Sequence, residues 1–186
     1  MRRRLAAIVS LLVLGSASAG AQELVTNGGF ETGNFSGWTQ SGCTGFDGVD
    51  SFSPHAGTYG AFFGAVDAPC TISQSVATVS GAQYTFSFWL GNQVPGVNSV
   101  AVSWGGSSVF SAANVGEQPY TQQSFTVTAA SSSTQISFAL SNRDNFFDLD
   151  DISVLPVRTV PEPGSLGLIA AGMIAMAAFG RPRRRS

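Results

Sequence analysis

Few residues in this 186-residue chain have side chains suited to acid–base or nucleophilic chemistry. The one histidine, His55, lies in a turn-like stretch that reads Ser-Pro-His-Ala-Gly. Asp148, Asp150 and Asp151 lie close together in sequence, and paired carboxylates are the machinery of glycosidases. No Gly-x-Ser-x-Gly motif supplies a nucleophile. Because the rest of an acid–base constellation is missing, we expect a protein that is not an enzyme, with a glycosidase as the catalytic alternative.

Aromatic side chains are the better candidates for a functional site. Tryptophan has a flat face that matches the C–H face of a sugar ring, and polar neighbours can bind the hydroxyls. Apolar and polar residues alternate over 84–90, which places Trp89 on the face opposite the phenylalanines of that stretch. We predict Trp89 as a ligand-binding residue, with Trp104 and Tyr59 as further candidates. The alternative is that these rings only cover the protein's own sheet.

The first 21 residues are typical of a secretory signal peptide. Arginines at 2–4 precede an apolar run over 5–14, and the small residues after it offer two Ala-x-Ala cleavage patterns. Ten apolar residues are too few to span a bilayer. The sequence therefore predicts export, with a folded domain over 22–157.

A second apolar segment lies near the C-terminus. Residues 163–180 carry no charge, and as a helix they would be about 27 Å long, close to the hydrocarbon thickness of a bilayer. The arginines that follow mark the cytoplasmic side. We expect a transmembrane helix over 164–180 and an arginine-rich tail over 181–186, so that the middle of the chain faces outward.

The stretch that precedes this segment reads Val-Pro-Glu-Pro-Gly over 160–164. Together with the apolar span and the terminal arginines, it resembles the PEP-CTERM sorting signal of Gram-negative bacteria that make extracellular polysaccharide. The resemblance implies that an inner-membrane exosortase recognises Pro161, Glu162 and Pro163, at the end of a linker over 158–163, and removes the tail. The protein would then lie transiently in the inner membrane and finally at the cell surface or outside the cell. An ordinary tail anchor is the alternative.

The middle segment is acidic. Residues 22–159 hold ten acidic residues against two arginines, a net charge of −8, and the chain has no lysine. A surface of this sign repels polyanions, so we expect no nucleic-acid partner.

The only two cysteines, Cys43 and Cys70, lie in this segment. An even pair in an exported domain is most simply a disulfide, which would stabilise the fold by roughly 3 to 4 kcal/mol on the chain-entropy model. Metal binding by the pair is the alternative.

Period-two alternation predicts antiparallel strands along the middle segment. The clearest are 84–90, 123–128 and 135–140, and we expect further strands at 59–65, 71–77, 98–104, 107–111 and 146–155. Eight or nine short strands that each have one apolar face can bury those faces only by stacking two sheets. We predict an all-β protein with an antiparallel β-sandwich.

Four short motifs indicate which kind of sandwich this is. Residues 24–31 read Leu-Val-Thr-Asn-Gly-Gly-Phe-Glu, and 74–76, 84–89 and 149–154 follow in the expected order. Together they resemble jelly-roll, galactose-binding-like carbohydrate-binding modules. Many members of that group hold a structural Ca²⁺ ion. The resemblance implies such an ion here, between Glu31 and Asp150 or Asp151, where carboxylates would supply hard oxygen ligands. The alternative is that these acidic residues are solvated at strand ends.

These observations predict an exported protein whose jelly-roll domain binds polysaccharide or extracellular matrix. The alternative is a structural component of the matrix or envelope that has no specific sugar site, because one fold hosts many functions.

Overall fold

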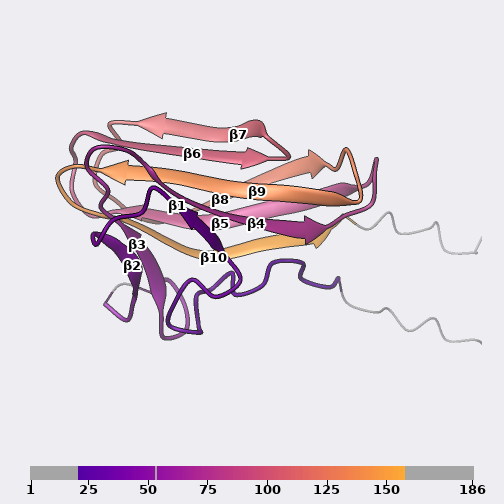
Figure 1. Cartoon of the computed structure of the whole chain (residues 1–186), viewed down its shortest axis with the longest axis horizontal. Helices are drawn as coiled ribbons and strands as arrows, with labels where there is room; N and C mark the ends of the chain where they lie inside the picture. Colours follow the sequence, from indigo (N-terminus) through magenta and orange to yellow (C-terminus); the bar gives the residue numbers. More distant parts are fainter. Residues whose placement is uncertain (1–20, 53, 158–186) are drawn as a thin grey trace, which may run out of the picture.

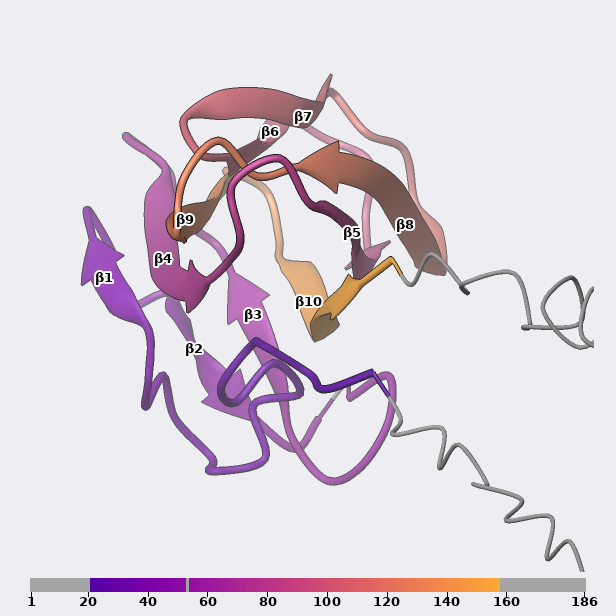
Figure 2. The same ribbon diagram turned by 90° about the vertical axis from the view of Figure 1, so that its right-hand side faces the viewer.

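The computed structural model describes residues 21–52 and 54–157, which form a sandwich of two antiparallel sheets (Figures 1 and 2). The predicted all-β class is confirmed. The proposed signal peptide apart from its last residue, the Pro-Glu-Pro element and the predicted transmembrane helix over 164–180 lie outside the described residues. Within the described ranges, no helix has the length and apolar character needed to cross a membrane.

Each sheet has five strands. Sheet A has the order β1-β4-β9-β6-β7 and sheet B has the order β2-β3-β10-β5-β8. The strands of sheet A are β1 (Thr39–Ser41), β4 (Cys70–Ala77), β9 (Ser133–Asn142), β6 (Asn98–Trp104) and β7 (Ser107–Ala113). Those of sheet B are β2 (Asp47–Asp50), β3 (Gly60–Phe63), β10 (Phe147–Pro156), β5 (Gln83–Asn92) and β8 (Gln118–Thr128).

The core between the sheets is rich in phenylalanine. Phe86 and Phe88 from β5 pack against Phe138 of β9, with ring centroids 5.8 and 5.1 Å apart in edge-to-face geometry. All three side chains are fully buried. Burial of each such side chain contributes about 1.5 to 3 kcal/mol, and the edge-to-face contacts add to it. The alternation that predicted β5 and β9 is thus the alternation between this core and the outer faces.

The strands β1 and β2 are additions to the predicted set. They are short and partly or fully exposed, and their sequences lack the alternation that marks the other strands. Between them the chain crosses from sheet A to sheet B. A disulfide joins Cys43, in this crossing, to Cys70 at the start of β4. The predicted disulfide is confirmed, and it fixes the crossing to sheet A.

The two ends of the described domain lie side by side. The N–H of Leu24 donates to the carbonyl of Val154 at 3.2 Å, and the carboxylate of Glu23 accepts the N–H of Val154 at 2.8 Å. The domain therefore begins and ends at one end of sheet B.

Candidate functional site

The outer faces of the two sheets differ in chemistry. The centre of sheet A carries small hydroxyl side chains, because Ser73, Ser137 and Ser103 face one another across β4, β9 and β6. The outer face of sheet B carries acidic, aromatic and amide side chains instead. Such a mixture of flat apolar surfaces and hydrogen-bonding groups is typical of a ligand site, so sheet B is the candidate functional face.

A row of outward-facing residues crosses sheet B at the end where β10 begins. Phe62 of β3 is the register partner of Asp148 of β10, which is in turn the partner of Gly91 of β5. A methyl group at Gly91 would lie 3.6 Å from both Asp148 Cβ and Tyr120 N, so Tyr120 of β8 continues the row. Because Gly91 has no side chain, the row has a depression at its centre, between Asp148 and Tyr120.

Two cavities meet over this row. The larger has a volume of about 680 Å³ and the smaller about 360 Å³, and Gln93 and Asp148 line both. We call the two together the groove. The larger cavity is also lined by Pro54, Gly91, Asn92, Glu117, Gln118, Pro119 and Tyr120, and the smaller by Asp50, Phe52, Phe62 and Phe146. Their volumes are in the range of small-molecule sites.

Asp148 is the charged group at the centre of the groove, and its side chain is only 6% exposed. The amide Nε2 of Gln93 donates to both of its carboxylate oxygens, at 3.1 and 2.8 Å. Burial raises the pKa of Asp148; the bond from Gln93 lowers it, and the nearby charge of Asp50 raises it further. Burial, and after it the carboxylate charges around the groove, also raise the pKa of Tyr120 well above its ordinary value.

Trp89 lies in the next row of sheet B, opposite Asp150 of β10 and Gln122 of β8. One face of its indole is already covered, because the ring of His55 stacks on it with centroids 3.8 Å apart and planes 18° apart. His55 belongs to the loop between β2 and β3, which crosses over this row. Trp89 is therefore on the predicted face of the predicted sheet, but the protein's own loop occupies the surface on which a sugar would stack.

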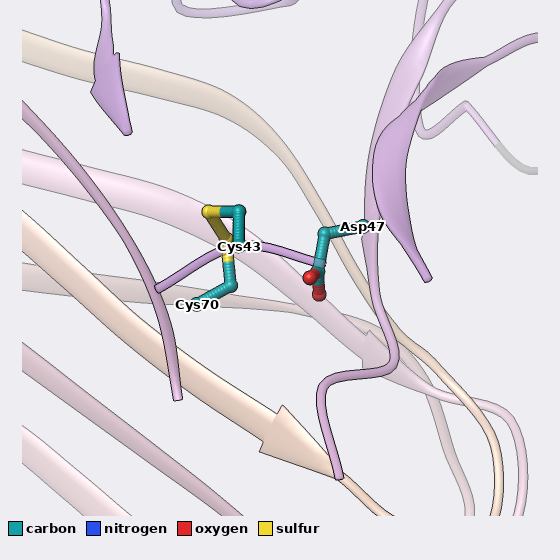
Figure 3. Close-up of side chains that lie close together, drawn as sticks. All are labelled: Cys43, Asp47 and Cys70. Atoms are coloured by element: carbon teal, nitrogen blue, oxygen red, sulfur yellow. A yellow bond between two sulfur atoms is a disulfide. The ribbon is translucent and has the colours of Figure 1, made fainter. Parts of the chain in front are cut away.

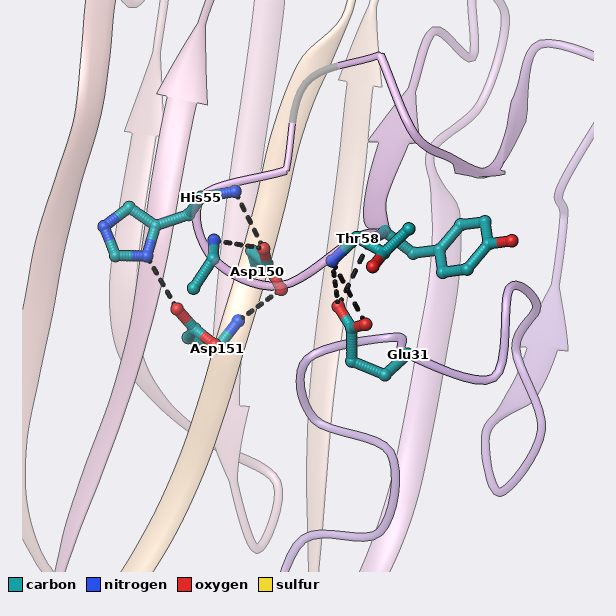
Figure 4. Close-up of polar contacts among 7 residues, drawn as sticks. Glu31, His55, Thr58, Asp150 and Asp151 are labelled. Carbon is teal, nitrogen blue, oxygen red and sulfur yellow. Dashed lines mark hydrogen bonds and ion pairs between the residues drawn. The ribbon is translucent and has the colours of Figure 1, made fainter.

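Carboxylates hold this loop in place (Figure 4). Asp150 accepts the backbone N–H groups of His55 and Ala56 at 2.8 and 3.3 Å, and Asp151 Oδ2 lies 2.6 Å from His55 Nδ1. Glu31 accepts the N–H of Thr58 at 3.0 Å. A β-bulge between Asp150 and Ser153 lets both adjacent aspartates point toward the loop, and Asp151 has a positive φ of 47°.

The three predicted calcium ligands are thus brought to one loop. Glu31, Asp150 and Asp151 all accept N–H donors or face His55. Among the described residues, they are not part of any set of three ligand atoms within 4.8 Å of one another. Ca²⁺ needs six to eight oxygen ligands around one point, so backbone carbonyls would have to complete a site at these carboxylates. The calcium site stays a prediction that a binding experiment has to test.

The other two predicted ligand residues lie away from the groove. Trp104 is 5% exposed, and its indole N–H donates to the carbonyl of Thr128 at 3.0 Å. It packs against Tyr84 and Phe86, so Trp104 is a core residue. Its role in ligand binding stays a prediction. Tyr59 is half-buried against Gly33, and its N–H donates to Glu31 Oε1 at 3.1 Å.

Cys43, Asp47 and Cys70 form the one cluster of potential metal ligands in the described part of the chain (Figure 3). The two sulfurs are joined in the disulfide and are not available as thiolates. Asp47 accepts the N–H groups of Thr44 and Gly64 at 2.8 and 3.1 Å, which fixes the turn before β2. The cluster is therefore structural.

Sequence reasoning missed most of the groove. Gln93 lies in a connection that shows no periodicity, and Phe62 and Phe146 were read only as parts of strands. One signal was present in the sequence. Gly91 is two residues from Trp89, and Asp148 is two residues from Asp150, so alternation places both residues of each pair on the same side of their strand. The two strands are neighbours, and all four residues lie on one face of sheet B.

Comparisons with known proteins identify a sorting motif in this chain. Residues 159–185 match the PEP-CTERM protein-sorting motif, so the chain carries this motif after the described domain. No curated protein sequence matches the chain.

Several solved structures share the fold. The module TmCBM61, solved in complex with β-1,4-galactotriose, is 21% identical with a TM-score of 0.61, over 73% of this chain and 99% of that one. The CBM22-1 xylan-binding domain of Paenibacillus barcinonensis Xyn10C is 17% identical with a TM-score of 0.55, over 77% and 100%. The C-terminal family 22 module of Clostridium thermocellum Xyn10B, studied for ligand binding in its cleft, is 13% identical with a TM-score of 0.54, over 75% and 96%. At these identities the likeness establishes the fold, that of carbohydrate-binding modules.

Proposed function

We propose that this protein is an exported, exosortase-processed polysaccharide-binding protein that binds its ligand without cleaving it, in the groove of sheet B. The observation that carries the proposal is the groove itself. It joins a buried carboxylate, an amide and aromatic rings across one sheet of a carbohydrate-binding-module fold. A sugar needs both polar and aromatic groups, because its hydroxyls form hydrogen bonds with polar groups and its C–H faces pack on aromatic rings.

The position of the groove supports the proposal. Asp148 lies near the start of β10, and the strand then runs eight residues to Pro156, roughly 26 Å at 3.3 Å per residue. The sorting motif follows the domain at that far end. A protein held through its C-terminal segment would thus keep the groove on the end of sheet B that is remote from the attachment.

Glycan-array binding of the full-length chain in mild detergent tests the proposal. We expect binding to at least one polysaccharide, and a loss of at least tenfold in affinity for Gln93→Ala and for Tyr120→Ala. One truncated contact in a site of this kind costs about 1.4 kcal/mol or more. Gln40→Ala, on the exposed strand β1 of sheet A, is the matched control and should bind like the wild type.

A structural component of the matrix is the second candidate, and one feature of sheet B favours it. The strand β8 is an eleven-residue edge strand of this sheet, and Gln118–Thr128 contains no charged residue. Long uncharged edges are able to pair with other chains. Binding to no glycan on the array, combined with self-association that Gln122→Lys abolishes, would establish this function instead.

A further inference from the structure

The charge of the groove has one sign. Asp50, Glu117 and Asp148 line it, and none of its described lining residues is lysine, arginine or histidine. The nearest imidazole, that of His55, is 5.2 Å from the ring of Tyr120 and faces Asp151. The carboxylates of the groove therefore have no cationic partner there.

These carboxylates act on one small volume. Asp148 is almost fully buried and belongs to both cavities, and Asp50 lines the smaller one. Glu117 and Tyr120 line the larger cavity together with Asp148. A concave site with low-dielectric walls focuses such a field. An anionic group would enter it at a high cost, whereas a cationic group would be attracted.

Starting from the proposed glycan-binding function, we propose that the groove selects polysaccharides whose sugars bear free amino groups. The ammonium of a 2-amino sugar would pair with Asp148 or Asp50, and its hydroxyls would meet Gln93 and Gln118. A charge-assisted hydrogen bond to a carboxylate is about twice as strong as a neutral one.

The apolar wall of the smaller cavity suits the same ligand. Phe62 and Phe146 meet edge to face with centroids 5.4 Å apart, and Phe52 beside them is 90% exposed. Aromatic faces pack on the C–H face of a sugar ring, and they also attract an ammonium group within about 6 Å. A small metal ion would leave this wall unused, which is why the observations favour an amino sugar over a divalent cation.

The test compares three oligosaccharides of equal length by calorimetry at pH 6 and low salt, in EDTA and with full-length protein. These are oligomers of N-acetylglucosamine, of glucosamine and of galacturonic acid. We expect the glucosamine oligomer to bind at least tenfold more tightly than the N-acetylated one, and the galacturonate oligomer not to bind. The preference should shrink in high salt, which screens charges.

Asp148→Asn and Asp50→Asn should each reduce the preference for the amine at least threefold, and Asp50→Asn retains the test if the buried substitution prevents folding. Asp67→Asn changes an exposed acid outside the groove and is the matched control. Equal affinity for the acetylated and free-amine oligomers overturns this inference and leaves the glycan-binding function intact. Failure to bind any glycan on the array overturns both.

Discussion

The ring of His55 lies flat on the indole of Trp89, with centroids 3.8 Å apart, while its Nδ1 lies 2.6 Å from Asp151 Oδ2. A loop residue thus covers an outer-face aromatic, and two carboxylates of β10 hold the loop. The row of sheet B that contains Trp89, Asp150 and Gln122 therefore lies between the groove and the rest of the sheet.

The first prediction concerns this stack. In His55→Ala we expect the free energy of unfolding to fall by about 1 to 2 kcal/mol, because the aromatic contact and the bond to Asp151 are both lost. Trp89 should become more exposed, with a shift of its fluorescence emission to longer wavelength. Urea denaturation and emission spectra measure both effects.

Trp89→Phe supplies the control, because it identifies the part of the emission that comes from this tryptophan. If His55→Ala unfolds like the wild type and its emission is unchanged, the loop does not cover Trp89 in solution.

The second prediction concerns pH. Burial raises the pKa of Asp150 from 3.8 to about 6, against the opposing effect of the N–H groups of Asp151, Ala56 and His55. Between these values the folded state holds a proton that the unfolded state has lost, so the free energy of unfolding falls as pH rises from 4 to 6 and levels off above.

Asp150→Asn replaces the titrating carboxyl group with an amide that does not titrate in this range. The wild-type free energy of unfolding minus that of the variant should therefore fall by on the order of 1 kcal/mol from pH 4 to pH 7, a value reduced for solvent screening. Urea titrations at several pH values measure the difference, in which other titrating groups largely cancel. A difference that is constant across this range would contradict the raised pKa.

The third prediction concerns calcium. Glu31, Asp150 and Asp151 already accept N–H groups or face His55, so an added ion would have to displace these contacts. If the predicted site binds calcium, the melting temperature should rise between EDTA and millimolar Ca²⁺, because a ligand that binds only the folded state stabilises it. An unchanged melting temperature would count against the site.

The sequence predicted the strands whose alternation is complete. β5 and β9 contribute to both the core and an outer face, so period two extends along all of β9 and along β5 as far as Leu90. β1 and β2 pack little apolar surface and leave no such pattern. Glu31 and Asp150, which the resemblance to jelly-roll modules placed at one site, contact the same loop.

The groove and the stack on Trp89 lay beyond sequence reasoning for a different reason. Both depend on which loop folds over which row of sheet B, and loop residues such as His55, Phe52 and Gln93 carry no periodic signal. Alternation within β6 does not say which face is the core, and in the structure the indole of Trp104 packs against Tyr84 and Phe86.

The fourth prediction concerns the disulfide. Cys43 and Cys70 are 27 residues apart, and a crosslink of this span lowers the entropy of the unfolded chain. The double variant Cys43→Ser, Cys70→Ser should lose about 3 to 4 kcal/mol of unfolding free energy. Urea denaturation of the oxidised wild type, the reduced wild type and the variant measures it. The reduced wild type should match the variant, and equal stability of all three would contradict the prediction.

The fifth prediction concerns sorting. Residues 159–185 match the PEP-CTERM motif, whose acidic residue here is Glu162. In a host that has an exosortase, Glu162→Ala should leave the tail uncleaved, and the longer chain should accumulate in the membrane fraction. Immunoblots of membrane and extracellular fractions measure this. Glu117→Ala, far from the motif in sequence, is the matched control and should be processed normally. Normal release of Glu162→Ala would mean that the segment acts as an ordinary anchor, and that the protein reaches its final location without recognition of this element.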